Sequence, residues 1–501
     1  MWRGSGLCFL ALSLLSVCNL PSQASALGQA PNIHPAPQRT LLQSTSNAGD
    51  CCARLEAIGF NSTLPVVLLD SSGQLIPHHV NTFITLCTCS KNSSIQDFYG
   101  PARAAGRGSS SAKFDKKSFK FRTLGEDGKG IDFPILGMPE EEDWILYGPE
   151  EDKTLGMRNY LAYNLARASG RYATRTVYAE VFLLDDGREL SMEHYNGVYI
   201  VQERVKRGKD RVNIKKLRPK NLSGGYIFNY DNNNYDDDEI TIGPLEGFAH
   251  PFVLKYRKNT GPEDNPTGTW LFNYLKEFQT ALNSGDLNYT SYIDGPSFTD
   301  YFLLTELTKN PDGYRGSTYM HKDRDGPLAM GPAWDYNEAF GHCCGYPIEG
   351  YFEEGRSGPG LSGGSAISPE GWRFNICDEP ERCLVHPTDG VSIWYRTMWK
   401  TDERFKAGAA FRWNELRASA WSNDAVQNII DDARTAIDPA VARNYDKYAS
   451  ALDVRKGADY EEIWQREVSA HETWVMERLK WMDSQFISGD NRNEVKISDS
   501  N

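Results

Sequence analysis

Two aspartates in the second half of the sequence have the surroundings expected of phosphoryl-transfer residues. Asp312 stands in the run NPDGY (310–314), and Asp335 stands in GPAWDYN (331–337). Phosphoryl transfer needs one carboxylate near the attacking hydroxyl and another that holds the metal bridging the phosphates. An Asp before Gly is also a common turn former, and an Asp after Trp can cap the next segment. The two motifs alone therefore leave a catalytic and a purely structural interpretation open.

The segment between the two aspartates predicts how they come together. Asp325 and Gly326 are typical of a hairpin turn, and they separate two short apolar stretches at 317–320 and 328–330. A hairpin there would bring Asp312 and Asp335 to the same end of two neighbouring strands. We therefore expect one shared site.

A pair of lysines could bind phosphate at the other side of such a site. Lys116 and Lys117 precede the alternating stretch 118–123, and alternation would turn one toward a cleft and the other toward solvent. Lys117 shares a face with Phe119 and Phe121. The alternative is a basic strand end in water, since exposed lysines are the rule.

Five further positions carry suitable chemistry. Arg107 and Arg158 could clamp phosphate oxygens in a fork or serve as structural ion-pair partners. Gly108 and Ser109 begin a Gly-Ser-Ser-Ser run whose backbone amides could approach phosphate. Glu203 could pair with the lysine, or it could be a surface glutamate.

The elements that must position these residues change character along the chain. Strand patterns cover 64–69 and 74–76, which predict a hairpin around the tight turn at 71–73. Further strand patterns cover 118–123, 178–184, 197–202 and 225–230, and one helical pattern covers 153–168. Helical spacing dominates later, at 270–283, 297–307, 392–401, 405–421, 425–436 and 460–486. The fold class is therefore α+β, with a β-rich N-terminal lobe (61–250) and a helical C-terminal lobe (251–488) that carries the catalytic and metal segment 305–341. This outline is also that of a kinase, but outline alone does not give function.

The ends of the sequence predict export. Residues 1–26 have the basic start, apolar run and small residues of a signal peptide, and 27–60 reads as a leader or linker. No stretch approaches the roughly 20 apolar residues of a membrane span. The tail 489–501 is polar.

The cysteines of the mature chain fall into two groups. An even count in an exported chain predicts disulfides within each group, whereas a zinc site is the competing interpretation. Asn-X-Ser/Thr sites would suit a glycoprotein. The groups are Cys51 and Cys52 with Cys87 and Cys89, and Cys343 and Cys344 with Cys377 and Cys383; the sequons are at Asn61, Asn92, Asn221 and Asn288.

The overall charge excludes some partners. A net charge of -13 and a pI near 5.3 argue against binding to nucleic acid or anionic lipid. No H-E-x-x-H motif occurs and no G-x-S-x-G elbow is evident, so metal-hydrolase and triad chemistry have no support.

Several motifs in consistent order resemble the CotH family of spore-coat and surface kinases. They are RGSSS (107–111) with KKSF (116–119), DK (152–153) with MRN (157–159) and LA (161–162), GVYI (197–200), GGYI (224–227), NPDGY, and GPAWDYNEAFG (331–341).

The resemblance implies an atypical protein kinase that uses ATP with Mg²⁺ or Mn²⁺ and modifies Ser or Thr of a protein substrate. It implies that Asp312 is the catalytic carboxylate and Asp335 a metal ligand. The family often has Asp where Asn337 stands here, although Asn is a competent oxygen ligand. A non-catalytic surface protein or adhesin is the alternative function.

Overall fold

A computed structural model describes residues 50–218, 220–231, 240–256, 266–342, 368–375 and 390–487. The predicted signal peptide, the tail 489–501 and the second cysteine group lie outside these residues.

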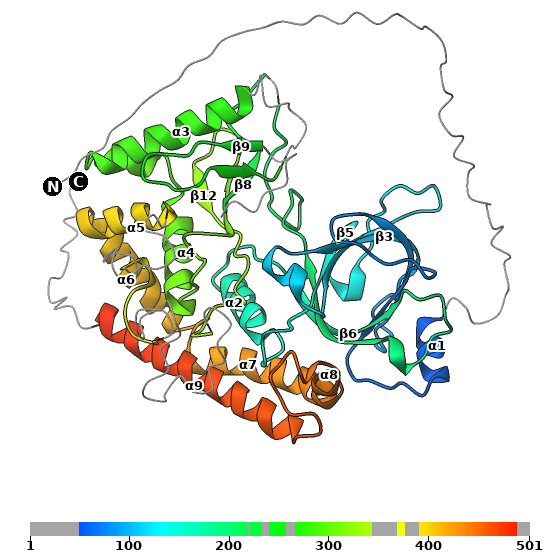
Figure 1. The fold of residues 1–501 in the computed structure, drawn as a ribbon. Helices are drawn as coiled ribbons and strands as arrows, with labels where there is room; N and C mark the ends of the chain where they lie inside the picture. The colour runs from blue at the N-terminus through cyan, green and yellow to red at the C-terminus, as the bar shows by residue number, and fades with distance from the viewer. Residues whose placement is uncertain are drawn as a thin grey trace, which may run out of the picture. The chain divides into compact units, whose positions relative to one another are not determined.

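The first part of the described chain is a closed seven-stranded barrel (Figure 1). Neighbouring strands are antiparallel except β1 and β6, which run parallel and close the ring. Alternate side chains fill the interior, as in β4, where Phe119 and Phe121 are core residues. The strands are β1 (Val66–Asp70), β2 (Thr82–Cys89), β3 (Tyr99–Arg107), β4 (Ser118–Thr123), β5 (Asp143–Tyr147), β6 (Thr176–Leu184) and β7 (Tyr195–Glu203), in the order β1-β2-β3-β4-β5-β7-β6.

The tight hairpin expected from residues 64–76 is wrong. β1 forms as predicted, but residues 74–76 are not a strand, and the antiparallel partner of β1 begins only at Thr82. Pro77 follows directly and has no backbone N–H to donate to a ladder, which disfavours a strand at this point. The barrel closure was not predicted from the sequence.

A second sheet has five strands in the order β12-β11-β8-β10-β9. The predicted hairpin at Asp325-Gly326 is confirmed, because β11 and β12 pair antiparallel on either side of it. The sheet crosses the predicted lobe boundary at residue 250, because two of its strands come before that residue and three come after it. They are β8 (Tyr226–Tyr230), β9 (Ile240–Ile242), β10 (Phe252–Leu254), β11 (Thr318–Lys322) and β12 (Leu328–Met330).

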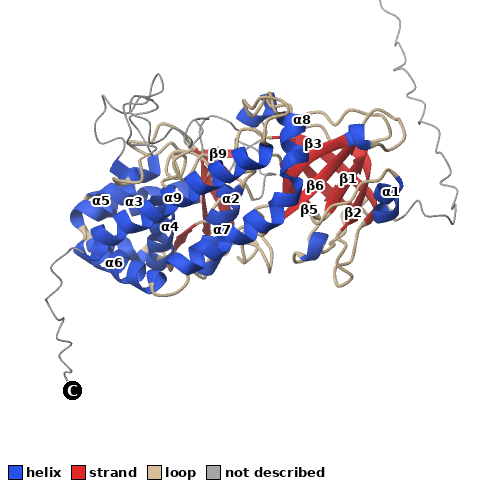
Figure 2. Cartoon of the chain, turned by 90° about the horizontal axis from the view of Figure 1, so that it is seen from below, coloured by secondary structure: helices blue, strands red, loops and turns tan. Residues whose placement is uncertain are grey.

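Most helices of the described chain come after residue 250. The predicted β-rich N-terminal and helical C-terminal pattern is therefore confirmed (Figure 2). The predicted helix between the strands is α2 (Met157–Ala168), closed by Gly170 at a φ of 88°. Buried indoles, among them Trp394, Trp413 and Trp474, fill the helical core. The other helices are α1 (Cys51–Ala57), α3 (Pro266–Asn283), α4 (Gly295–Thr308), α5 (Gly390–Thr401), α6 (Glu403–Arg417), α7 (Asn423–Ile437), α8 (Val441–Tyr448) and α9 (Tyr460–Ile487).

None of the helices in the described residues combines the length and the apolar character that crossing a membrane requires.

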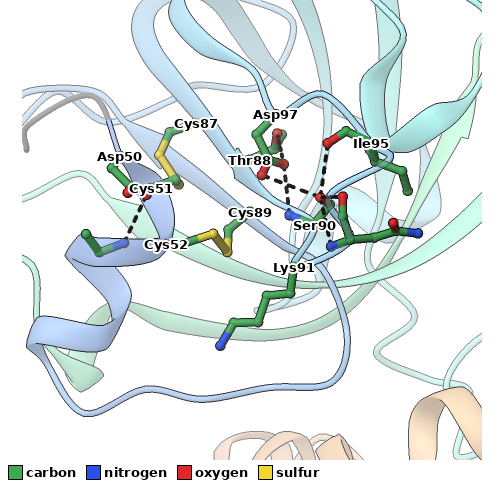
Figure 3. Close-up of a disulfide and its surroundings, with 12 residues drawn as sticks. Asp50, Cys51, Cys52, Cys87, Thr88, Cys89, Ser90, Lys91, Ile95 and Asp97 are labelled. Carbon is green, nitrogen blue, oxygen red and sulfur yellow. Dashed lines mark hydrogen bonds between the residues drawn. A yellow bond between two sulfur atoms is a disulfide. The ribbon is translucent and has the colours of Figure 1, made fainter.

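Two disulfides join α1 to β2 (Figure 3). Cys51 bonds to Cys87 and Cys52 to Cys89, with Cα–Cα distances of 5.7 and 5.2 Å that are ordinary for disulfides. Asp50 caps the same helix by accepting a hydrogen bond from the Ala53 amide at 3.1 Å. The predicted pairing within the first cysteine group is confirmed, and its sulfurs are engaged with one another rather than with zinc.

Candidate active site

The segment that carries Asp335 is held by hydrogen bonds from α2. The Asp335 amide donates to the Tyr163 hydroxyl at 3.1 Å, and the Tyr336 amide donates to the Asn159 side-chain oxygen at 2.7 Å. The Asp335 carbonyl accepts from the Asn310 side chain at 3.0 Å. Asp335 itself has a φ of 65°, a conformation that Asp tolerates better than most residues. The backbone on both sides of this carboxylate is therefore fixed.

A buried ion pair anchors the start of α2. Arg158 contacts the carboxylate of Asp152, and its guanidinium also donates to the Thr154 hydroxyl at 2.9 Å. Arg158 is only 1% exposed. The structure thus places Arg158 as a structural partner of Asp152 rather than as a clamp open to phosphate.

Three carboxylates gather around Ser317, just before β11. The Ser317 hydroxyl donates to Asp335 at 3.1 Å, and its amide donates to Asp231 at 3.3 Å. Asp312 lies near enough to both to raise their pKa values. Its own carboxylate accepts from Arg315 at 2.9 Å. The structure therefore brings Asp312 and Asp335 together as predicted and adds Asp231.

Asp231 was not predicted from the sequence. It follows β8 directly, and Tyr230 of β8 pairs with Thr318 of β11, so Asp231 comes opposite Ser317. The sequence does show an acidic residue at the end of a strand pattern. Its place in the site follows only from the pairing of β8 with β11, more than eighty residues later in the chain. Asn159 and Tyr163 were within predicted segments, yet their roles also depend on tertiary contacts.

The electrostatics of this cluster are those of carboxylates facing one another. Burial raises the pKa of Asp231 to about 6, and the charges of Asp335 and Asp312 contribute in the same direction. Burial and the charge of Asp312 also raise the pKa of Asp335, against the opposing effects of Arg107 and Ser317. The site thus has an excess of negative charge.

Basic and glycine-rich residues flank Asp335 from the barrel side. Arg107 ends β3, and its guanidinium lies 5.8 Å from the centre of the Trp334 ring. Gly108 follows at a φ of 110°, where a side chain would collide with the Ser111 hydroxyl group. Ser109 is exposed. The structure brings Arg107, just before this turn, to the Trp334–Asp335 segment.

The two lysines have opposite environments. Lys116 is fully buried, and its ammonium donates to the Asn444 side-chain oxygen at 2.7 Å. The ammonium nitrogen lies 5.2 Å from the centre of the Tyr199 ring and 5.0 Å from the centre of the Tyr448 ring. Burial lowers the pKa of Lys116 to about 7. Lys117 is exposed and donates to the Ala112 carbonyl at 2.9 Å.

One lysine is buried and one is exposed, as alternation predicted. The sequence left open which lysine turns inward, although Lys117 was expected to share a face with Phe119 and Phe121, and the structure buries Lys116. The strand begins only at Ser118, so its alternation does not extend to either lysine.

Glu203 is not brought to either lysine, and its predicted pairing is corrected. Its carboxylate bonds to Arg175 and Arg211, each at 2.7 Å, and to the Tyr172 hydroxyl at 3.1 Å. Lys116 lies beside Gly197 at the opposite end of β7, and six strand residues span about 20 Å. Glu203 therefore stabilises the far end of the barrel.

Asn337 faces a second group of acidic residues. Its amide nitrogen donates to Glu151 at 3.2 Å and approaches Glu338 at 3.5 Å. Burial raises the pKa of Glu151, with a further contribution from Asp152. The side-chain oxygen of Asn337 accepts no hydrogen bond within the described residues.

The donor set fits a hard divalent cation. The three aspartates offer oxygen ligands and mutual repulsion that a cation would relieve, and Mg²⁺ usually takes one or two carboxylates together with phosphate and water. The aspartates are not as tightly clustered as Glu141, Glu142 and Asp143, the trio of described residues whose oxygens lie within 4.8 Å of one another. Asp335 and Asp231 would hold a metal whose remaining ligands come from a nucleotide, whereas the Asn337 amide faces Glu151 and its role as a metal ligand stays a prediction from the sequence.

The comparison with protein families places the chain in a known family. The chain matches the family described as CotH kinase protein over residues 104–482, which include every candidate site residue named above. A search of curated proteins found no match. Because the matched region is most of the chain, this protein belongs to the CotH kinase family.

Proposed function

We propose that this protein is an atypical protein kinase that transfers the γ-phosphoryl group of ATP to Ser or Thr of exported proteins. The observation that carries the proposal is the cluster of carboxylates at Ser317, which bonds to Asp231 and Asp335, with Asp312 near enough to raise the pKa values of both and so to favour a bound cation. Mg²⁺ or Mn²⁺ bound there would neutralise phosphate charge.

The aspartates would have different tasks. Asp335 is rigidly positioned and half-buried, as suits a metal ligand. Asp312 keeps a 26% exposed side chain and lies on a turn, where an acceptor hydroxyl could reach it. In this proposal its carboxylate orients or deprotonates that hydroxyl.

The nucleotide would lie between this cluster and the barrel. Arg107 and the turn at Gly108 and Ser109 supply a cation and backbone amides beside Asp335. Of the two lysines, Lys116 is retained as the candidate. It is fully buried and held by Asn444 rather than by a glutamate, so in this proposal its ammonium exchanges Asn444 for a phosphate oxygen.

Export is supported by the two disulfides and the predicted signal peptide. Disulfides persist in oxidising compartments and are rare in the cytosol. A kinase of this location would act on proteins that share the secretory route or the cell exterior.

The decisive experiment compares two aspartates with the same backbone conformation. Asp335 has a φ of 65° and Asp325, an exposed residue of the β11–β12 turn, has a φ of 60°, so Asn should fit equally well at both positions. Asp335→Asn should abolish Mg²⁺- or Mn²⁺-dependent ATP consumption, whereas Asp325→Asn should retain it.

Thermal unfolding of both variants shows whether they remain folded. Equal ATP consumption by wild type and Asp335→Asn, or none by wild type with either metal and a Ser/Thr-containing protein mixture, would contradict the proposal.

A further inference from the structure

A pocket rich in basic side chains lies at strands β3, β4 and β5 of the barrel. It is lined by Arg103, Lys120, Arg122 and Arg204, together with Asn81, Asp143 and the barrel-core residues Phe121 and Trp144. The whole chain has a net charge of -13, so this concentration of cations is against the overall composition. The pocket therefore calls for a local explanation.

Strand register places these side chains side by side. On β4, Phe119 and Phe121 point into the barrel, so Lys120 and Arg122 point outward. Arg103 of β3 pairs directly with Arg122 of β4. Like charges opposite each other on one face destabilise a sheet, so this pairing has no benefit for folding.

Nearby carboxylates only partly neutralise the pocket. Arg122 binds Asp143 through two nitrogens at 2.7 and 2.8 Å, and Lys206 contacts Glu141 at 2.6 Å and Asp143 at 2.8 Å. These contacts also explain the acidic trio at 141–143, which binds side-chain cations. Arg204 also lies 3.9 Å from Asp143, whereas Arg103 makes no side-chain hydrogen bond or ion pair within the described residues.

Exposed apolar side chains border the same surface. Phe83 pairs with Arg103 on the other side from Arg122, and it is 68% exposed. Val80, beside Asn81, is 59% exposed. Arginine next to an exposed aromatic residue is the composition of a protein-binding surface.

We infer that the basic pocket and its apolar border, formed by Arg103, Lys120, Arg122, Arg204, Phe83 and Val80, bind an acidic segment of a protein partner that also carries an apolar side chain. Resting on the proposed function, that partner is the protein substrate. Arg103 precedes Arg107 by four strand residues, about 13 Å, so a short extended segment could reach from the pocket toward the proposed active site.

Direct binding tests this inference without requiring catalysis. The probe is a fluorescein-labelled ten-residue peptide of Glu and Asp with one central Leu, measured by anisotropy without ATP. The same peptide with Gln and Asn in place of the acids should bind at least tenfold more weakly.

Arg103→Glu should weaken binding of the acidic peptide more than tenfold, and Phe83→Ser several-fold. Arg103→Glu places opposite charges across β3 and β4, so it should remain folded, which thermal unfolding checks. The matched control is Lys400→Glu on α5, an exposed lysine in the helical region, which should change the affinity less than twofold.

Asp335→Asn should bind the peptide like wild type, which separates failure of this inference from failure of the proposed kinase function. The inference is overturned if Arg103→Glu and Lys400→Glu behave alike, or if acidic and neutral peptides bind equally. Tighter binding of a heparin-derived oligosaccharide than of the acidic peptide, unaffected by Phe83→Ser, would also overturn it and indicate a glycan site.

Discussion

Two acidic clusters in this molecule have opposite electrostatics. At 141–143, Asp143 is buried beside Arg122, Lys206 and Arg204, and the first two donate hydrogen bonds that hold its pKa at about 2 despite burial. At the candidate active site, Asp231 is buried beside Asp335 and Asp312, and its pKa is raised to about 6. Carboxylates matched by cations stabilise the fold, whereas carboxylates that face one another indicate a site made for a ligand.

This difference is more informative than the spacing of the carboxylates. The cluster at 141–143 has the tighter geometry, with its oxygens within 4.8 Å, yet its charge is already balanced by protein groups. The aspartate cluster is looser. Arg315 pairs with Asp312 at 2.8 Å, and Lys255 and Arg107 act on Asp231 and Asp335, yet burial and the neighbouring carboxylates still raise the pKa values of Asp231 and Asp335. Charge balance therefore distinguishes the candidate metal site from the structural one.

The largest expected effect is on catalysis. Asp312→Asn should lower phosphoryl transfer by about 10²- to 10⁴-fold, because a positioned general base contributes a factor of this size. Asn can still accept the hydrogen bond from Arg315, so Mg²⁺–ATP affinity and the thermal unfolding temperature should stay near those of wild type. Transfer assays with single-turnover kinetics provide the measurement, and wild-type transfer by this variant would exclude the catalytic role.

The next largest effect is on the free energy of unfolding, which an Asp→Asn substitution should change in opposite directions in the two clusters. Asp143→Asn removes the charge that Arg122 and Lys206 pair with, so the free energy of unfolding should fall by about 1–3 kcal/mol. Asp231→Asn is the same substitution, but it removes the repulsion of Asp231 by Asp335 and Asp312. In EDTA, which keeps the cluster free of metal, it should leave the free energy of unfolding unchanged or raise it. Urea denaturation of both variants checks the contrast, which a similar loss in both would refute.

A pH series should sharpen the same contrast. The folded pKa of Asp143 lies below the ordinary value of 3.8, so its stabilising contribution is complete above about pH 4 and is lost as the pH falls toward 2. The folded pKa of Asp231 lies above 3.8, so this group favours the folded state most at about pH 4 and below, and less as the pH rises to about 6.

The measurement is the difference in unfolding free energy between wild type and each Asn variant from pH 3 to 7, in EDTA. The difference should vary chiefly below pH 4 for Asp143→Asn and between pH 4 and 6 for Asp231→Asn. Coincident profiles for the two variants would show that the two environments do not differ as proposed.

Local features of the sequence predicted the parts of the fold that depend on neighbouring residues. The turn residues Asp325 and Gly326 predicted the hairpin of β11 and β12, and the helical spacing of apolar residues predicted α2. The barrel was missed because its closure depends on the parallel pairing of β1 with β6, which are more than one hundred residues apart.

The candidate site shows the same limit. Asp312 and Asp335 were found because each lies in a short motif, and the hairpin between them is local. Asp231 depends on the register of β8 with β11, and the surroundings of Lys116 depend on Asn444, which lies 328 residues later. Sequence patterns could not supply these distant partners.

The smallest expected effect concerns Lys116 and Lys117. Charged lysine is costly to bury, and the lowered pKa of Lys116 reflects that cost. Lys116→Met keeps a similar volume without the charge, so stability should be unchanged or higher. If Lys116 serves the nucleotide, its loss should weaken ATP binding by about tenfold, or 1.4 kcal/mol, the size of one charge-assisted contact.

Lys117→Met is the matched control, because Lys117 is exposed and bonds only to the nearby Ala112 carbonyl in the described chain. It should change ATP affinity less than twofold. Calorimetric titration of ATP with Mg²⁺ into each variant gives the affinities. Unchanged affinity in Lys116→Met would make Lys116 a structural tie between β7 and α8, and the nucleotide would then depend on Arg107 for its cation.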